Sequence, residues 1–196
     1  AFPYEKERAA VRTGLDDTLR RYLRSGVTSV VDAGGPMWNF EVRAHASRLA
    51  LAPRVAVAGP LLSSVARPQL EAGDPPIVRV IDPGVARALV RVQATLKPDL
   101  VKLWWVVPSG GKPADWLPAG QAAIEEAHAL GLRVAVHATE LETARTAVLA
   151  GADILVHDVA DADVDDAFVE LLRKKGTLYV STLVVNEGYA SVFQGR

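Results

Sequence analysis

Three polar residues interrupt apolar runs that have the composition of buried strands: Lys102, His137 and His157. Near the carboxyl ends of strands in parallel α/β folds, such side chains build active sites. A single strand histidine is more often a hydrogen-bonded core residue than a ligand. Neighbouring strands, however, lie about 4.8 Å apart, so imidazoles at matching positions of two strands converge on one point that suits a metal ion. We therefore expect His137 and His157 to bind metal.

Lys102 precedes the two histidines by one predicted strand and strengthens this hypothesis. An unpaired ammonium in a protein core is costly, so a lysine at this place is not readily explained by packing. A row of Lys102, His137 and His157 across three consecutive strands predicts a metal site with Lys102 among its catalytic residues.

Two other residues are candidates for substrate contact. Trp104 and Trp105 follow Lys102, and strand alternation sends them to opposite sides, so one of them faces the mouth of the site. Thr182 falls near the end of the last predicted strand. We expect Trp104 and Thr182 to bind substrate, while Asp158 could orient a ligand or cap the next element.

Short β-rich runs alternate with helical patterns along the chain. Strands are predicted over residues 27–32, 55–58, 100–107, 133–138, 154–159 and 178–184. Helices are predicted over residues 7–25, 40–51, 82–96, 118–130, 141–149 and 164–175. Apolar runs this continuous indicate strands buried on both faces, and therefore a parallel sheet. The polar, turn-rich residues 63–81 are predicted to be a long connection that shapes the site.

A parallel sheet of βα units is either a doubly wound layer or a barrel. The segment Asp32-Ala33-Gly34-Gly35-Pro36 lacks the glycine order of a dinucleotide site, which disfavours the first alternative. A closed barrel needs about 250 residues, and the chain has 196. The predicted strands therefore fit an open sheet or strands 2 to 7 of a (β/α)8 TIM-type barrel, as one α/β domain.

Composition excludes several classes of function. The chain is 49% hydrophobic and 23% charged, which is typical of a globular protein. A net charge of -1 gives no reason to expect nucleic acid or an anionic membrane as partner. The absence of cysteine excludes disulfides and thiolate ligands. No apolar run reaches the roughly 18 residues of a membrane span. We expect a soluble protein, favour the cytoplasm over export, and leave a homo-oligomer open.

At the residues named above, the sequence resembles the amidohydrolase superfamily, in particular its imidazolonepropionase-like and prolidase-like branch. The resemblance covers nearly the whole chain. The segments that carry it are residues 26–35, 101–104, 127–138 and 151–157, which resemble the second strand, the fourth strand, the helix leading into the fifth strand, and the sixth strand of that branch.

The resemblance implies that residues 1–196 are the central portion of one metal-dependent hydrolase barrel domain. It implies cleavage of a C–N bond, in an amide, cyclic amide or dipeptide, by metal-activated water. The substrate would be a small or peptide-like molecule. The cofactor would be one or two divalent ions, with zinc favoured, held by His137 and His157 and bridged by a carboxylated Lys102.

The family's first strand carries an H-x-H pair and its eighth strand a metal-binding Asp, and neither occurs here. The chain begins at Ala1 without an initiator Met or a signal peptide. We therefore expect these ligands outside the 196 residues, and little or no activity from these residues alone. Two alternatives stay open: a Schiff-base lyase or aldolase-type barrel that uses Lys102, and a barrel fragment without catalytic function.

Overall fold

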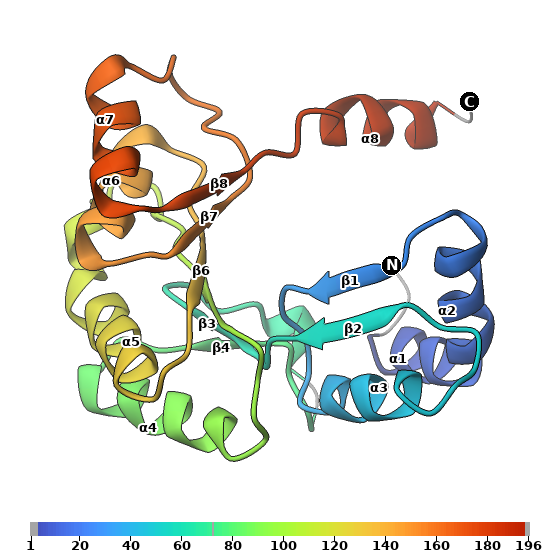
Figure 1. Cartoon of the computed structure of the whole chain (residues 1–196). Coiled ribbons are helices and arrows are strands. Elements are labelled where there is room, and N and C mark those ends of the chain that lie inside the picture. Colours follow the sequence, from blue (N-terminus) through green and yellow to red (C-terminus); the bar gives the residue numbers. More distant parts are fainter. Residues whose placement is uncertain (1–3, 72, 195–196) are drawn as a thin grey trace.

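The computed structural model describes residues 4–71 and 73–194 as a parallel α/β structure (Figure 1). Its helices are α1 (Tyr4–Thr13), α2 (Leu15–Arg24), α3 (Asn39–Ala46), α4 (Pro83–Ala94), α5 (Leu117–Ala129), α6 (Leu141–Ala150), α7 (Asp166–Lys175) and α8 (Val185–Phe193). Its strands are β1 (Ser29–Asp32), β2 (Arg54–Val57), β3 (Leu61–Ser63), β4 (Ile77–Arg79), β5 (Val101–Trp104), β6 (Val134–His137), β7 (Ile154–Val156) and β8 (Leu178–Val180). Residue 1, where the sequence suggests an upstream extension, lies outside the described residues.

All strand pairs are parallel, and they form two sheets. β1 pairs with β2, and the other strands form a six-stranded sheet in the order β4-β3-β5-β6-β7-β8. A single bridge between Ala58 and Leu100 connects the end of β2 to the beginning of β5. The run from β2 to β3 therefore pairs first with β1 and then with β5. Apart from β4, which pairs with β3 on the side away from β5, neighbouring strands follow chain order, as they do in a barrel. β1 and β8 are not paired to each other in the described part.

Each of the predicted strands overlaps an observed strand, so the prediction of a parallel α/β fold is confirmed. The prediction of one helix over residues 7–25 was wrong, because the helix is interrupted at Gly14, a poor helix former. Residues 63–81 are not merely a connection, since they contain β4 and the 3-10 helix Pro68–Leu70. These elements are three residues long, too short for a periodic pattern. Helix α8 follows the last strand, where none was predicted.

The helices that follow the strands have clear local signals at their ends. Asp82 caps α4 by accepting a hydrogen bond from the backbone N–H of Val85, and Pro83 occupies the first turn. Helices α6 and α7 end at Gly151 and Gly176, whose φ angles of 109° and 68° lie in the left-handed region. These stops return the chain to the sheet, so that each strand begins on the same side.

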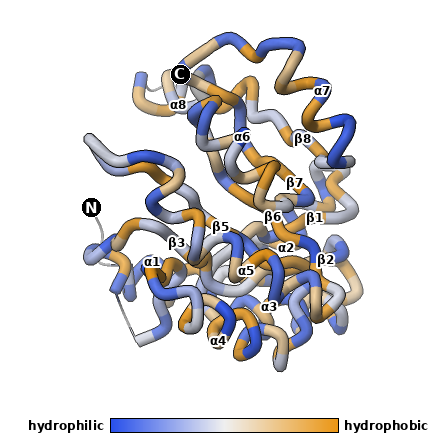
Figure 2. The backbone as a smooth tube through the Cα atoms, turned by 90° about the vertical axis from the view of Figure 1, so that its left-hand side faces the viewer, coloured by the Kyte–Doolittle hydropathy of each residue, from blue (hydrophilic) through white to orange (hydrophobic). Residues whose placement is uncertain are grey.

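The main hydrophobic core lies on one face of the six-stranded sheet. Helices α4 to α7 cover this face (Figure 1). Its buried members include Leu103, Trp105, Val136, Leu155 and Phe168. The tube in Figure 2 alternates between hydrophobic and hydrophilic residues along α7, as expected of a helix with one face in the core. None of the helices in residues 4–71 and 73–194 has both the length and the apolar character needed to cross a membrane.

The opposite face of the sheet has a smaller apolar cluster, formed by Ala58, Leu100 and Ala135 with Ile154 and Val156 packed against it. It is not covered by helices α4 to α7 (Figure 1). Side chains toward the carboxyl ends of the strands on this face are therefore available for chemistry.

Candidate active site

Lys102, Trp104 and His137 lie on the face of the sheet opposite the main core. In the register of β5 and β6, Lys102 pairs with Ala135, and Trp104 pairs with His137. Paired residues of parallel strands share a face, and residues two apart on one strand do so too. Trp105 is fully buried on the other face, against Trp116. Of the two tryptophans, Trp104 is therefore the one on the face that holds Lys102.

His157 reaches the same site by a route that strand alternation does not predict. It lies one residue beyond β7, because the register pairs His137 with Val156. Alternation would send His157 to the side of Leu155, which belongs to the main core. His157 instead has a φ of 81°, in the left-handed region, and its ring centroid lies 4.7 Å from that of His137. The prediction of matching positions was thus wrong in register, although the two imidazoles do converge.

The left-handed conformation of His157 is itself informative. Among the described residues, His157 and Lys97 are the two non-glycine residues with a positive φ. A non-glycine residue in this region costs on the order of 1–3 kcal/mol, and such residues cluster at functional sites. The backbone N–H of His157 still donates to the carbonyl of Val180 in β8, at 2.9 Å. The conformation therefore redirects the side chain without detaching the backbone from the sheet.

Three rings form a row along this edge of the sheet. Trp104 and His137 meet edge to face with centroids 5.8 Å apart, and His137 and His157 meet in the same way. Two residues before Trp104 on β5 lies Lys102, which is 3% exposed and whose Nζ has no hydrogen-bond partner among residues 4–71 and 73–194. Burial lowers the pKa of Lys102 to about 8. The structure thus buries a cation without a counter-charge next to two imidazoles.

Both histidines favour the neutral form. Burial lowers the pKa of His137 to about 4, with smaller contributions from His157 and from the charge of Lys102. Burial and Lys102 also lower the pKa of His157, while the carboxylate of Asp158 opposes them. At neutral pH each ring therefore has a nitrogen lone pair available to a ligand or a proton.

The segment beyond β8 contacts His157. Thr182 lies after the end of β8, not within the strand as predicted, and its backbone N–H donates to Asp158 Oδ2 at 3.0 Å. Its Oγ1 lies 3.4 Å from Nδ1 of His157. A hollow of about 350 Å³ opens here. Its lining residues include His137, Thr139, His157, Asp158, Thr182 and Tyr189. Thr182 therefore borders the histidine pair, and Asp158 holds it there.

The glycine-rich loop after β1 contacts Lys102, and the sequence assigned this loop no role in the site. Asp32 accepts hydrogen bonds from the backbone N–H of Gly34 at 3.3 Å and from Nδ2 of Asn39 at 2.6 Å. Gly34 has a φ of 132°, and a Cβ there would lie 2.5 Å from Cδ1 of Leu61 and 3.4 Å from Cγ of Lys102. Burial raises the pKa of Asp32. The sequence feature that could have indicated this loop as part of the site is an Asp at the end of a strand, followed after one residue by two glycines.

The side chains of this site that could bind a metal ion are two imidazoles and a lysine. In the part of the chain that the structure describes, no three His, Asp or Glu side chains are grouped as a metal ion would require. His128 is elsewhere, near the end of α5, where its Nε2 lies 2.8 Å from Oδ2 of Asp153. It is a structural residue that ties α5 to the start of β7.

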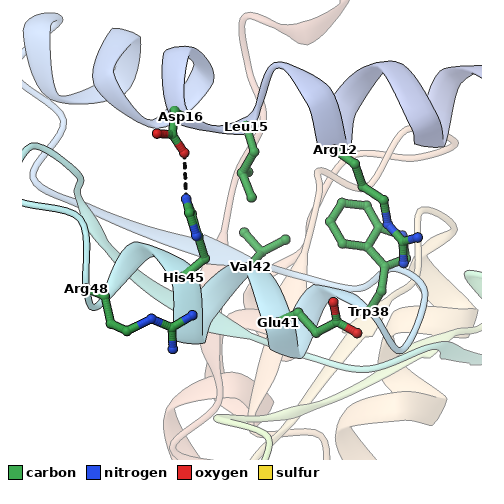
Figure 3. Close-up of a pocket in the computed structure, with 8 residues that line it drawn as sticks. All are labelled: Arg12, Leu15, Asp16, Trp38, Glu41, Val42, His45 and Arg48. Carbon is green, nitrogen blue, oxygen red and sulfur yellow. Dashed lines mark hydrogen bonds and ion pairs between the residues drawn. The ribbon is translucent and has the colours of Figure 1, made fainter.

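A separate hollow of about 390 Å³ lies between α3 and the first two helices (Figure 3). In it, Nε2 of His45 lies 2.5 Å from Oδ1 of Asp16, and the guanidinium of Arg12 lies 4.9 Å from the ring centroid of Trp38. Glu41 and Arg48 add one charge of each sign. This hollow contains none of the residues of the row, and we assign it no chemistry.

No protein-family model and no curated protein sequence matches the chain. Solved structures do match it. An amidohydrolase superposes with a TM-score of 0.75 at 23% identity, over 95% of this chain and 50% of its own. Ochratoxinase of A. niger gives a TM-score of 0.76 at 20% identity, over 94% and 48%. A prolidase complexed with N-methylphosphonate-L-proline gives 0.71 at 25% identity, over 93% and 48%.

These similarities extend over nearly all of this chain, which spans about half the length of each matched structure. At such identities they establish the fold. The polypeptide therefore has the prolidase-like fold of the amidohydrolase superfamily.

Proposed function

We propose that this chain, which has the prolidase-like amidohydrolase fold, is the central portion of a metal-dependent hydrolase that cleaves C–N bonds. The observation that carries the proposal is the close approach of His137, at the end of β6, and His157, one residue beyond β7, with Lys102 on the same face two residues before the end of β5. Its substrates would be amides, cyclic amides or dipeptides. The likeness to a prolidase in complex with a proline phosphonate favours dipeptides.

The side chains fit a metal ion chemically. Two neutral imidazoles with ring centroids 4.7 Å apart offer two nitrogen ligands. If Nδ1 of His157 donates its hydrogen to Oγ1 of Thr182, the lone pair of Nε2 is the one that can bind a metal ion. A bound divalent ion, zinc by preference, would lower the pKa of water and polarise a carbonyl. The protein's part is to hold the two rings and to exclude solvent from Lys102.

Lys102 fits as a ligand once it is carboxylated. Its neutral amine would attack carbon dioxide and lose a proton, forming a carbamate whose single negative charge is shared by two oxygens. Carboxylation replaces the buried, unpartnered ammonium of Lys102 by an oxygen ligand for the metal. The cost of burying an unpaired ammonium is thereby removed. The lowered pKa of Lys102 supplies the neutral amine near pH 8.

The rest of the site would come from a larger barrel. Apart from β4, neighbouring strands follow chain order, β1 and β8 each pair on one side alone in the described residues, and the matched structures are about twice as long. In this proposal β1, the run of β2 and β3, β5, β6, β7 and β8 correspond to strands 2 to 7, and an H-x-H pair and an Asp on the first and eighth strands would complete the ligands.

Metal analysis of the full-length protein tests the proposal. Purified protein should contain about one or two equivalents of a divalent metal, because a site of this kind binds tightly at neutral pH. His137→Ala and His157→Ala should each lower that content severalfold. His128→Ala is the matched control, because His128 is bonded to Asp153 away from the site. Less than about 0.2 equivalent in the unsubstituted protein would contradict the proposal.

One observation favours a second candidate, a Schiff-base lyase. Lys102 is a buried amine whose Nζ has no partner, as nucleophilic lysines require. Borohydride reduction in the presence of a carbonyl substrate separates the two candidates. A trapped adduct on Lys102 would support the lyase, whereas a carboxylated lysine gives none. Hydrolysis of N-acyl amino acids or Xaa-Pro dipeptides without an adduct would support the hydrolase.

A further inference from the structure

We infer that Asp158 and Thr182 are positioning residues for His157. The carboxylate of Asp158 orients the hydroxyl of Thr182, and the hydroxyl oxygen then accepts a hydrogen bond from Nδ1 of His157. This arrangement keeps the proton of the neutral ring on Nδ1 and leaves the lone pair on Nε2, where a metal ion of the site would bind. The part that concerns a metal ion rests on the proposed function and deepens it.

The turn that follows β7 is fastened to the segments on both sides of it. The backbone N–H of His157 donates to the carbonyl of Val180 in β8 at 2.9 Å. The backbone N–H of Ala160 donates to the carbonyl of Thr139, in the loop after β6, at 2.8 Å. These bonds hold the backbone on both sides of Asp158, and they thereby limit where its carboxylate and the ring of His157 can point.

Asp158 accepts hydrogen bonds from Thr182. The backbone N–H of Thr182 lies 3.0 Å from Oδ2 of Asp158, and its hydroxyl Oγ1 lies 3.5 Å from the same oxygen. A carboxylate has no hydrogen to donate, so the hydrogen between these two side chains is that of the hydroxyl. The hydroxyl oxygen therefore keeps its lone pairs for another partner.

The other partner of this hydroxyl is the ring of His157. Oγ1 of Thr182 lies 3.4 Å from Nδ1 of the ring. Because the hydroxyl hydrogen is directed to Asp158, the hydroxyl can only accept from Nδ1, and Nδ1 must carry the proton. A neutral imidazole has one N–H, so Nε2 is then unprotonated. Metal-binding histidines are usually held in this way, through the ring nitrogen that does not bind the metal.

Two histidines outside the site have their polar partner at the other ring nitrogen. Nε2 of His128 lies 2.8 Å from Oδ2 of Asp153, and Nε2 of His45 lies 2.5 Å from Oδ1 of Asp16. Since a carboxylate accepts, each of these rings carries a hydrogen on Nε2. His157 should therefore have the opposite tautomer, and the other two histidines supply references within the same protein.

NMR of the full-length, metal-free protein with nitrogen-15 in its histidines tests the tautomer directly. At about pH 8.5, where an ordinary histidine is neutral, the proton of His157 should be on Nδ1, and those of His45 and His128 on Nε2. His157→Gln identifies the signals of this ring. Thr182→Val removes the hydroxyl and should shift His157 toward the Nε2–H form, whereas Thr182→Ser should keep the Nδ1–H form.

Asp158→Asn tests the part played by the carboxylate. The amide oxygen can still accept from the backbone N–H of Thr182, but the amide N–H groups can donate to the hydroxyl. The hydroxyl can then donate to Nδ1, so the tautomer of His157 should become mixed. Asp163→Asn is the matched control, because Asp163 is an exposed carboxylate a few residues further along, and it should leave the tautomer unchanged.

Zinc affinity, measured by competition with a chelator, gives a second readout on the full-length protein. Thr182→Val and Asp158→Asn should each bind zinc about tenfold to a hundredfold more weakly, the range expected when a partner of a metal-binding histidine is lost. Thr182→Ser should recover most of the affinity. A role in packing alone predicts the reverse order, because valine keeps the shape of threonine and serine lacks its methyl group.

A proton on Nε2 of His157 in the unsubstituted protein would overturn the inference. A tautomer that responds to neither Thr182→Val nor Asp158→Asn would overturn it as well, even if the protein binds zinc tightly and the proposed function stands. If the tautomer follows both residues but the protein binds no zinc, the positioning of His157 stands and the proposed hydrolase function fails.

Discussion

At the scale of single residues, the site brings together basic groups whose burial destabilises the metal-free protein. Lys102 is buried without a partner, and His137 and His157 are held neutral beside it. His157 also adopts a left-handed backbone conformation. None of these features improves packing, and together they favour a role in binding or catalysis.

Replacing the lysine should therefore stabilise the metal-free protein. Lys102→Met removes an unpartnered cation and keeps an apolar stem of similar length, so the free energy of unfolding should rise by about 1–3 kcal/mol at pH 7. Urea unfolding with a chelator present measures the change. Lys174→Met, on the surface of α7, is the control and should change stability by less than about 0.5 kcal/mol. A destabilised Lys102→Met protein would show that the ammonium has a partner.

The pKa of His137 predicts how stability depends on pH. Its pKa is about 4 in the folded protein and 6.5 for an ordinary histidine, so the folded state binds fewer protons between these values. Stability should therefore rise with pH from about 4 to 6.5, and His137 should contribute about 1–2 kcal/mol to that rise. His137→Gln should flatten this part of the profile, as measured by urea unfolding of metal-free protein. An unchanged slope would place the titration on another group.

At the scale of elements, the loop after β1 is the part that confines Lys102. Asp32 and Asn39 hold the loop at both ends of the glycine pair, and Gly34 approaches the side chains of Leu61 and Lys102. The close approach is possible because glycine has no Cβ and accepts a φ of 132°.

Gly34→Ala should destabilise the protein. The added methyl group would lie 2.5 Å from Cδ1 of Leu61, and the backbone conformation is one that alanine disfavours. We expect a loss of about 1–3 kcal/mol in the free energy of unfolding, measured by urea titration. Gly188→Ala in α8 is the control, because nothing lies within 4 Å of its added Cβ. Equal stability of Gly34→Ala and the unsubstituted protein would contradict this packing.

At the scale of the whole molecule, apolar side chains are exposed on β1, on the segment that follows β8 and on α8. Val31 of β1 is 62% exposed, and Leu183, Val184 and Phe193 are 79%, 74% and 85% exposed. Unpaired strand edges and contiguous apolar surface promote association between molecules. In the barrel that we propose, further strands would cover these surfaces.

A polypeptide of residues 1–196 expressed alone should therefore self-associate and have little or no hydrolase activity. Size-exclusion chromatography with light scattering measures the association. The triple substitution Leu183→Ser, Val184→Ser and Phe193→Ser should reduce this association. Leu149→Ser, at an exposed position of α6, should not reduce it. A monodisperse monomer that hydrolyses amides as fast as the full-length protein would contradict both this prediction and the proposed barrel.

The sequence by itself predicted the parallel α/β order and singled out Lys102, His137 and His157 as candidate site residues, because apolar periodicity and interruptions of it are local signals. It did not determine β3 and β4, which are stabilised by pairing with residues far along the chain. The tertiary structure alone decided that a left-handed turn brings His157 to His137, and that Arg67 stacks on Trp104. Both depend on backbone angles and on loops that meet at the sheet edge, and neither is encoded in residue spacing.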